Sequence, residues 1–357
     1  LRFTLAPIHG RMMLMGVYEK LIRPLMFQFE PERAQSLADW ILRRRWLWRL
    51  ASRHYNIWDS RLEVTVAGLR FPSPVGLAAG YDKHCEVLDS LLALGFAYVT
   101  AGTVLPEPQP GNPKPRIFRQ AQQESLINSL GFPSKGMAAA SENLSQLSHE
   151  YKPLVVSIAG LTIAEFVSCH GTLQPLADAI ELNISSPNTQ GLRVFQDDTT
   201  LKDLIRSLNQ YRTKPLFLKI PPYFNDEERE RVLKLVHVAR DMKIDGITVA
   251  NTHPIEMPQL SVGRGGLSGR PLLEHTLRMV ADVRAELGPS VAVNACGGIF
   301  DSTDTLRALR AGANTVQLFT GLIYKGPSVA RSINQGLVRL MDRSGAGSLQ
   351  ELVHQES

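Results

Sequence analysis

Eight short apolar runs, each ending in glycine or small polar residues, constrain the fold of this chain more than any other feature. A helix-like stretch usually follows each run, and such alternation of strand and helix is typical of a parallel sheet. Eight units of this kind favour an α/β fold of the (β/α)8 TIM-barrel type over a doubly wound sheet. The runs cover residues 75–79, 98–101, 154–158, 179–184, 216–220, 246–250, 291–295 and 315–318.

A barrel of this type predicts where the chemistry lies, because its sites form at the carboxyl ends of the strands. Polar residues and glycines do follow the apolar runs, so we expect them to meet at one mouth. These segments are residues 80–83, 102–103, 157–160, 183–188, 219, 251–252, 297–298 and 319–321.

The segment after the fourth run carries most of the chemical information. Asn183, Ser185, Ser186, Asn188 and Thr189 crowd one short turn. Carboxamides both donate and accept, which suits the edge of a planar imide or amide ligand, and a serine with a suitable neighbour can move a proton. An ordinary turn rich in asparagine, serine and proline is the alternative interpretation.

Glycine-rich segments at the other side of the mouth predict an anion site. Residues 297–299 follow the seventh run, residues 319–321 follow the eighth, and residues 265–271 follow the sixth. Barrels of this type often hold a phosphate between the last two of these loops, where backbone N–H groups can approach it. Tight turns without a ligand are the alternative, because glycine is the usual turn residue.

Two lysines, Lys83 and Lys219, are expected to face the same mouth. Two ammonium groups in one cavity are costly unless anions neutralise them. A reduced flavin beside Lys219 and a substrate carboxylate beside Lys83 would meet this need, and the protein would then orient the ring and adjust its charge.

The first 55 residues differ from the rest, and we assign three segments: 1–55, a barrel at 56–340, and a tail at 341–357. Residues 37–49 place tryptophans and leucines beside four arginines, which is typical of an amphipathic helix at a membrane surface. A surface helix that covers the barrel with arginine stems is the alternative. The tail is polar and contains glycine, so we expect it to be frayed.

Bulk composition excludes several classes of protein. No apolar run approaches the roughly 18 residues that a spanning helix needs. The three cysteines, Cys85, Cys169 and Cys296, form no close pair, so neither a disulfide framework nor a metal site is expected. The net charge of +5 is mild, and we expect no nucleic-acid partner.

Seven segments together resemble the dihydroorotate dehydrogenase family, in order and over residues 18–335. The paired N-terminal helices, and a serine at the base position, are similar to its quinone-reducing class 2 branch. The segments are residues 78–83, 102–104, 108–112, 115–119, 127–132, 183–193 and 265–271.

This resemblance implies an enzyme that oxidises dihydroorotate to orotate in de novo pyrimidine (UMP) biosynthesis. A hydride would pass to FMN, and a membrane quinone would reoxidise the flavin. It also implies a peripheral membrane protein at the cytoplasmic face of a bacterial inner membrane. We expect a monomer, with the oligomeric state left open.

The resemblance also implies roles for individual residues. Ser186 would be the catalytic base, Thr189 would belong to a proton relay, and Arg119 would lie near the quinone path. The implied substrate-binding residues are Lys83, Asn128, Ser129, Leu130, Gly131, Phe132, Asn183, Asn188, Asn251 and Thr252. The implied cofactor-binding residues are Ala79, Gly80, Thr103, Ser157, Asn183, Lys219, Ala250, Gly269, Gly298, Phe319 and Thr320.

Several positions depart from the family pattern. Ser157, Ile158 and Ala159 stand where an Asn-Ile-Gly run is usual, Ala250 replaces a common threonine, and Phe319 a common tyrosine. Each lost hydrogen bond to a ligand costs on the order of 1 kcal/mol. Two alternatives therefore stay open: a flavin barrel with another pyrimidine or a soluble acceptor, and a non-catalytic barrel that binds a phosphate ligand.

Overall fold

The computed structural model describes residues 16–147, 152–185 and 191–355, and eight parallel strands form its centre. They are β3 (Val75–Leu77), β4 (Tyr98–Val104), β9 (Leu154–Ile158), β10 (Ala179–Asn183), β11 (Leu216–Lys219), β12 (Gly246–Val249), β15 (Ala292–Cys296) and β16 (Thr315–Leu318). Pairing of β16 with β3 closes them into a barrel. Each strand falls within or overlaps one of the eight predicted runs, so the predicted (β/α)8 barrel is confirmed.

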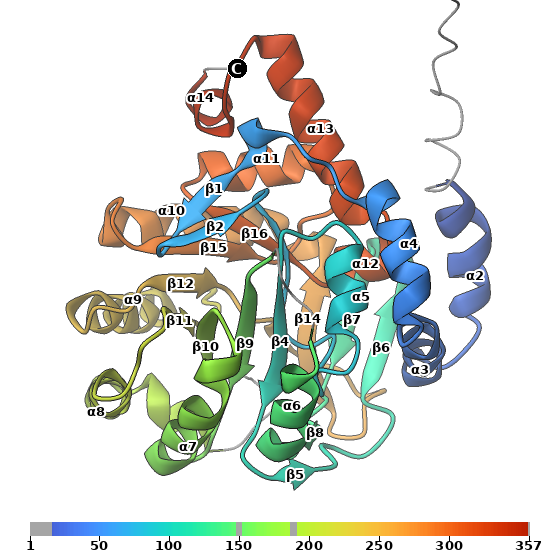
Figure 1. Ribbon diagram of the computed structural model, residues 1–357. Coiled ribbons are helices and arrows are strands. Elements are labelled where there is room, and N and C mark those ends of the chain that lie inside the picture. The colour runs from blue at the N-terminus through green and yellow to red at the C-terminus, as the bar shows by residue number, and fades with distance from the viewer. Residues whose placement is uncertain (1–15, 148–151, 186–190, 356–357) are drawn as a thin grey trace, which may run out of the picture.

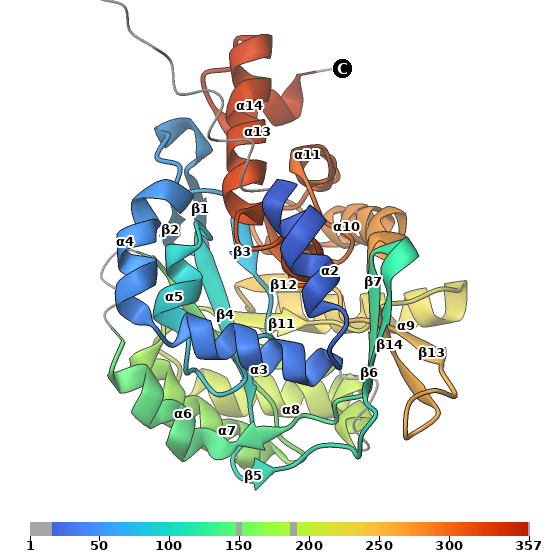
Figure 2. The same cartoon turned by 90° about the vertical axis from the view of Figure 1, so that its right-hand side faces the viewer.

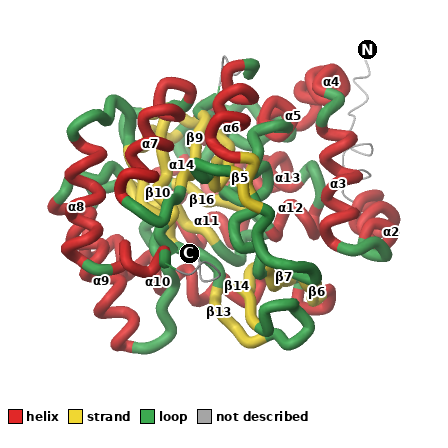
Figure 3. The backbone as a smooth tube through the Cα atoms, turned by 90° about the horizontal axis from the view of Figure 1, so that it is seen from below, coloured by secondary structure: helices red, strands yellow, loops and turns green. Residues whose placement is uncertain are grey.

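Helices surround the barrel, as the view in Figure 3 shows. Helix α8 illustrates why they form. The Asp197 side chain accepts hydrogen bonds from the Thr199 and Thr200 backbone amides and begins the helix, and its buried leucines repeat at helical spacing. The helices are α5 (Leu88–Ala93), α6 (Gly136–Ser145), α7 (Ile163–Leu173), α8 (Asp198–Asn209), α9 (Asp226–Asp241), α10 (Leu273–Leu287), α11 (Ser302–Arg310) and α12 (Thr320–Lys325).

A two-stranded hairpin fills the amino-terminal end of the barrel. Its strands are β1 (Val64–Val66) and β2 (Leu69–Phe71), and Phe71 packs against the Tyr98 ring at 4.7 Å between centroids. The Tyr98 ring occupies the lumen beside Gly76, where an added Cβ would lie 2.3 Å from the ring. Glycine at position 76 is therefore required, and this end is closed by side chains.

Short antiparallel strands form a wall above the opposite end. Strands β6 (Ile117–Gln120), β7 (Ser125–Asn128), β14 (Arg264–Gly269) and β13 (His253–Glu256) make one sheet. Strands β5 (Pro108–Gln109) and β8 (Ser134–Lys135) make a second, smaller one. These strands were not predicted from the sequence, and the pairing of β7 with β14 joins segments more than a hundred residues apart.

The N-terminal segments pack beside the barrel as a separate helical layer (Figures 1 and 2). They comprise a π-helical turn (Tyr18–Ile22), α2 (Arg23–Met26), α3 (Pro31–Leu42) and α4 (Arg45–Tyr55). Ser90 donates to the Leu42 carbonyl at 2.6 Å, and Arg116 pairs with Glu32 at 2.8 Å. These contacts attach α3 to the barrel side of the mouth.

Several large apolar side chains of this layer are exposed. Leu21, Leu25, Trp40, Trp46 and Leu50 each expose more than half of their surface. Within the described ranges, every helix is too short or too polar to cross a bilayer. The layer therefore presents an exposed apolar face without a membrane span.

The prediction of a frayed end after residue 340 is wrong. Helix α13 (Val329–Ser344) continues past this point, and α14 (Leu349–His354) follows it. Leu349 and Leu352 are buried at 4% and 3% exposure, and the Ser348 side chain caps α14 by accepting from the Glu351 amide. Burial of these leucines outweighs the polar composition. The boundaries assigned at residues 55 and 340 stay predictions.

Leu352→Ala tests whether α14 belongs to the folded core. We expect a loss of about 2–5 kcal/mol in the free energy of unfolding, because a buried leucine would leave a cavity. Urea denaturation measures it, with exposed Gln350→Ala as the control, which should change stability by less than about 0.5 kcal/mol. Equal, small effects of both substitutions would show that the helix is loosely attached.

Candidate active site

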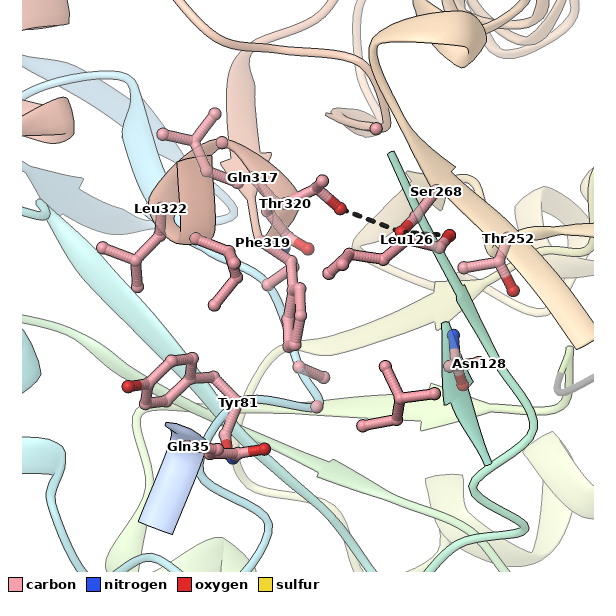
Figure 4. Close-up of a pocket in the computed structure, with 18 of the residues that line it drawn as sticks. Gln35, Tyr81, Leu126, Asn128, Thr252, Ser268, Gln317, Phe319, Thr320 and Leu322 are labelled. Carbon is pink, nitrogen blue, oxygen red and sulfur yellow. Dashed lines mark hydrogen bonds between the residues drawn. The ribbon is translucent and has the colours of Figure 1, made fainter. Parts of the chain in front are cut away.

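One cavity of about 450 Å³ is lined both by the N-terminal helices and by the barrel mouth. The helices contribute residues such as Tyr18, Met26 and Gln35. Figure 4 shows the cavity with Gln35 and Tyr81 at one side and Asn128 and Thr252 at another. The candidate residues that line it are Ala79, Gly80, Lys83, Thr103, Arg119, Asn128, Leu130, Gly131, Phe132, Asn183, Lys219, Ala250, Asn251, Thr252, Gly269, Gly298, Phe319 and Thr320.

Two predicted site residues in the described part of the chain do not line the cavity, and three others cannot be assessed there. Ser129 is fully buried, and Ser157 lies behind Thr103, to whose hydroxyl it is hydrogen-bonded at 3.1 Å. Ser186, Asn188 and Thr189 lie outside the described residues. The roles of all five stay predictions.

A chain of hydrogen bonds holds two carboxamides at the mouth. Asn183, the last residue of β10, donates to the Thr103 hydroxyl at 2.9 Å. Its oxygen accepts from the Ser185 hydroxyl at 3.1 Å, and Asn251 donates to the Ser185 oxygen at 3.0 Å. Because Ser157 supports Thr103 from behind, the chain fixes the orientation of Asn183. The arrangement can present donors and acceptors to a planar polar ligand.

Lys83 follows β3 and faces the same cavity. Its ammonium donates to the Gly80 carbonyl. Burial lowers the pKa of Lys83 to about 8, and the nearby carboxylates Asp39 and Asp82 oppose this shift. Burial, followed by repulsion from Asp82, raises the pKa of Asp39 to about 7. Lys83 is therefore a cation below about pH 8 and can bind an anionic ligand.

Lys219 lies deeper, at the end of β11. It is 5% exposed, and its Nζ lies 3.8 Å from the Cys296 sulfur. Burial lowers the pKa of Lys219, but Cys296 and Glu181 oppose burial and the net pKa is raised. A buried ammonium therefore lines the bottom of the cavity, where a negatively charged ring system would be stabilised.

The glycine loops fit a phosphate-bearing cofactor. Gly298 has a φ of +77°, and an added Cβ would lie 2.4 Å from the Leu273 amide nitrogen. Gly269 has a φ of +102°, with the Glu124 carbonyl oxygen 2.3 Å from such a Cβ. Side chains are excluded at both positions, so backbone groups are left to face the cavity. Nearby, the Ser268 and Thr320 hydroxyls are 2.8 Å apart (Figure 4).

A buried polar atom also fits a bound ring with N–H groups. Gln317 on β16 lines the cavity and is 2% exposed. Within the described part of the chain, its side-chain oxygen has no hydrogen-bond partner. Such an atom is unfavourable unless a ligand or water donates to it. Together with Lys219 and the glycine loops, it forms a site whose donor and acceptor set suits a flavin nucleotide.

Arg119 lies at the side of the cavity nearest the helices. Its guanidinium donates to the Phe29 carbonyl at 2.8 Å and lies 4.6 Å from the centre of the Phe27 ring. Burial lowers the pKa of Arg119, but an arginine stays charged at neutral pH. This cation is thus held against the N-terminal segment, at one side of the cavity lining.

The structure brings to this site four further residues to which the sequence pattern assigned no role: Ser185, Ser268, Cys296 and Gln317. All four lie in or directly beside strands that end at the mouth. Their position at strand ends was a usable signal for Ser185 and Cys296. The inward direction of Gln317 depends on strand register, which the residue pattern does not reveal.

Comparisons with known proteins agree with this geometry. A family model described as dihydroorotate dehydrogenase matches residues 61–341. The chain is 39% identical to a dihydroorotate dehydrogenase (quinone) of Mesorhizobium japonicum, covering 95% of this chain and 96% of that protein. It is 35% identical to a protein of the same name from Chelativorans sp., with the same two coverages.

Solved structures show the same similarity. A dihydroorotate dehydrogenase (DHODH) from Eimeria tenella, crystallised with ferulenol, superimposes with a TM-score of 0.77 at 31% identity. The match covers 90% of this chain and 94% of that one. The ligand-free form of the Eimeria protein gives a TM-score of 0.76 at 32% identity, over 88% and 98%.

The depressed pKa of Lys83 predicts a pH limit for binding a carboxylate ligand, and orotate is a suitable probe. Because the ammonium is lost above about pH 8, the orotate dissociation constant should rise above that pH, by up to about tenfold per pH unit. Calorimetric titrations between pH 6 and 9.5 measure this. Lys83→Arg should keep the orotate affinity constant above pH 8, because arginine stays charged there. Asp39→Asn should remove any smaller change in the dissociation constant near pH 7, where Asp39 loses its proton. A constant affinity up to pH 9.5 in the unmodified protein would exclude the role.

Proposed function

Because the chain belongs to the dihydroorotate dehydrogenase family, we propose that it oxidises dihydroorotate to orotate in pyrimidine biosynthesis, with FMN as cofactor and a membrane quinone as acceptor. The observation that carries this proposal is the continuity of the cavity. One space is lined by Lys83 and the asparagines at the mouth and by the N-terminal helices at its other side. Substrate and acceptor could therefore reach one cofactor from different directions.

The cofactor part of the proposal rests on the lining of the mouth. FMN, when bound, supplies a two-electron acceptor for hydride. Lys219 would balance the negative charge of its ring, and Gln317 would accept a hydrogen bond from it. Gly269, Gly298 and Thr320 would hold the phosphate, because they line the cavity and backbone N–H groups and hydroxyls can donate to an anion.

The substrate part rests on Lys83 and the asparagines. Lys83 would bind the carboxylate of dihydroorotate, and Asn128, Asn183 and Asn251 would bind the edge of the pyrimidine. Ser186, which directly follows Ser185 in the chain, would remove the proton from C5. A serine hydroxyl is a poor base, so this role requires a partner that accepts its proton.

The acceptor part rests on the helical side of the cavity. Apolar residues including Ile22, Met26 and Ile41 line it beside Arg119, and the outer face of the same helices exposes leucines and tryptophans. An apolar quinone dissolved in a membrane would enter from such a face. The relatives named for quinone dependence support this acceptor.

Anaerobic reduction tests the reaction and the base together. We expect the purified protein to be yellow and to bleach when dihydroorotate is added without oxygen. Ser186→Ala should keep its flavin but bleach about 10²–10⁴-fold more slowly, the usual effect of removing a general base. Stopped-flow absorbance measures the rate, and Ser145→Ala on the exposed side of α6 serves as the control. Bleaching of Ser186→Ala at the normal rate would refute the assignment of the base.

The same experiment separates the alternative functions. Protein without flavin absorbance would favour a non-catalytic barrel. Rapid bleaching by dihydrouracil, which lacks the carboxylate, would favour another pyrimidine. Reoxidation by a soluble acceptor but not by a quinone analogue would exclude the proposed acceptor.

The apolar helical face predicts attachment to lipid vesicles. Leu50→Glu and Trp46→Glu change residues of α4 that are 74% and 63% exposed, so we expect both to weaken cosedimentation with vesicles by at least several-fold. Tyr211→Glu is a matched control, because Tyr211 is 64% exposed but follows α8 on the barrel. Equal binding of all three variants would show that this face is not the membrane contact.

A further inference from the structure

The eight barrel strands, as the structure describes them, contain two charged residues. These are Glu181 on β10 and Lys219 on β11. The two strands are neighbours, with Asn183 paired to Lys219 and Glu181 paired to Phe217. Paired residues of parallel strands share a face, and residues two apart share it too. Since Asn183 and Lys219 line the cavity, Glu181 points into the lumen one layer below them.

The surroundings of Glu181 are those of a group that needs a counter-ion. Glu181 has no solvent exposure. One carboxylate oxygen accepts from the Thr248 hydroxyl at 2.8 Å, and the other has no hydrogen-bond partner in the described part of the chain. A buried carboxylate with one hydrogen bond is strongly unfavourable unless a cation compensates it. Among the residues of the strands, Lys219 is the cation available.

Other titratable groups near the pair do not replace Glu181. Cys296 contacts Lys219, but burial raises the pKa of this thiol, so it is neutral at pH 7. The Tyr98 hydroxyl is bonded to Thr315, and burial raises the pKa of Tyr98 as well. Cys296 and Glu181 both oppose the effect of burial on the pKa of Lys219. Glu181 is the carboxylate of the two, and strand register places it below Lys219.

We propose that Glu181 is a positioning residue for the cofactor chemistry: its carboxylate is the internal counter-ion that keeps Lys219 protonated below the cofactor. This inference rests on the proposed function in one respect, namely that the group bound above Lys219 is a flavin. The pair sets the charge that the ring meets. Lys219 would contact the cofactor, and Glu181 would act through Lys219.

Glu181→Gln tests the role, because it keeps the shape and the contact with Thr248 but removes the charge. With the anion gone, Lys219 should lose its proton about one to two pH units lower, the effect of one unit charge at a protein-like effective dielectric constant. At pH 6 the FMN midpoint potential should rise, since the reduced cofactor is the more negative form. Above the lowered pKa of Lys219, where the variant has lost this ammonium charge, the midpoint potential should fall below that of the unmodified protein.

Spectroelectrochemical titration from pH 5.5 to 9.5 measures these changes, and Glu181→Asp, which keeps the charge, should restore most of the original profile. Identical profiles for the unmodified protein and Glu181→Gln would overturn the proposal, because Glu181 would then have no effect on the charge of Lys219. A purely structural role of Glu181 would not change the pH at which the midpoint potential begins to fall.

A double-mutant cycle on the apoprotein gives a second readout that needs no cofactor. Glu181→Gln leaves the charge of Lys219 without its counter-ion, and Lys219→Met does the same to Glu181. Each substitution should therefore lower the urea concentration at the midpoint of unfolding. The double variant removes both charges and should be more stable than the sum of the single effects predicts. Additive effects would overturn the proposal. If the protein bound no FMN, the proposed function would fail, while this cycle would still decide whether the two charges are coupled.

Discussion

The parallel pairing of β16 with β3 is the contact on which the rest of the structure depends. It joins Val316 to Val75 and Leu318 to Leu77, the last strand to the first. Without it the strands would form an open sheet, and their carboxyl ends would be spread along an edge. With it, Lys83 after β3, Asn183 on β10 and Lys219 on β11 line one cavity. Closure thus brings Lys83 and Lys219, which are more than a hundred positions apart in the sequence, into one site.

Closure also fixes which end of the barrel is open. The Tyr98 and Phe217 rings fill the lumen at the amino-terminal end, each beside a glycine, Gly76 or Gly246, whose Cβ would collide with the ring. Hairpin residues Val66 and Phe71 pack onto these rings. The Tyr98 hydroxyl is hydrogen-bonded to Thr315 at 2.7 Å, and Lys83 and Lys219 line the cavity toward the other end. The lumen therefore changes from packed aromatic rings at one end to ammonium groups at the other.

Much of this fold could be predicted because strands and helices are encoded locally. The apolar runs and the residues that follow them identified the barrel and most of the cavity lining, including Lys83 and Lys219. The antiparallel wall could not be predicted, because the pairing of Asn128 with Gly266 depends on a contact across 138 residues. The tail was misjudged because Gly345 and Gly347 suggested fraying, whereas Leu349 and Leu352 find a buried surface.

The site, like the fold, could be predicted only in part from the sequence. Asn183 and Asn251 were recognisable from residue type and position, but the bridging hydroxyl of Ser185 between them became visible only in three dimensions. Glu181 interrupted an otherwise apolar run, and on sequence alone it was only an irregularity. Register places it in the lumen below Lys219, where its charge has a consequence.

The two sides of the cavity differ chemically in a way that would keep an anionic substrate and an apolar electron acceptor apart. Lys83 and Lys219 line the mouth. The helical side is lined by apolar residues together with Arg119. An anionic substrate is favoured at the mouth by Coulomb attraction and disfavoured on the apolar side by desolvation. An apolar acceptor has the opposite preference. A cofactor held between these regions could be reduced from one side and oxidised from the other, with neither partner entering the other's region. The partition arises from where the barrel places its charges and where the helices cover it.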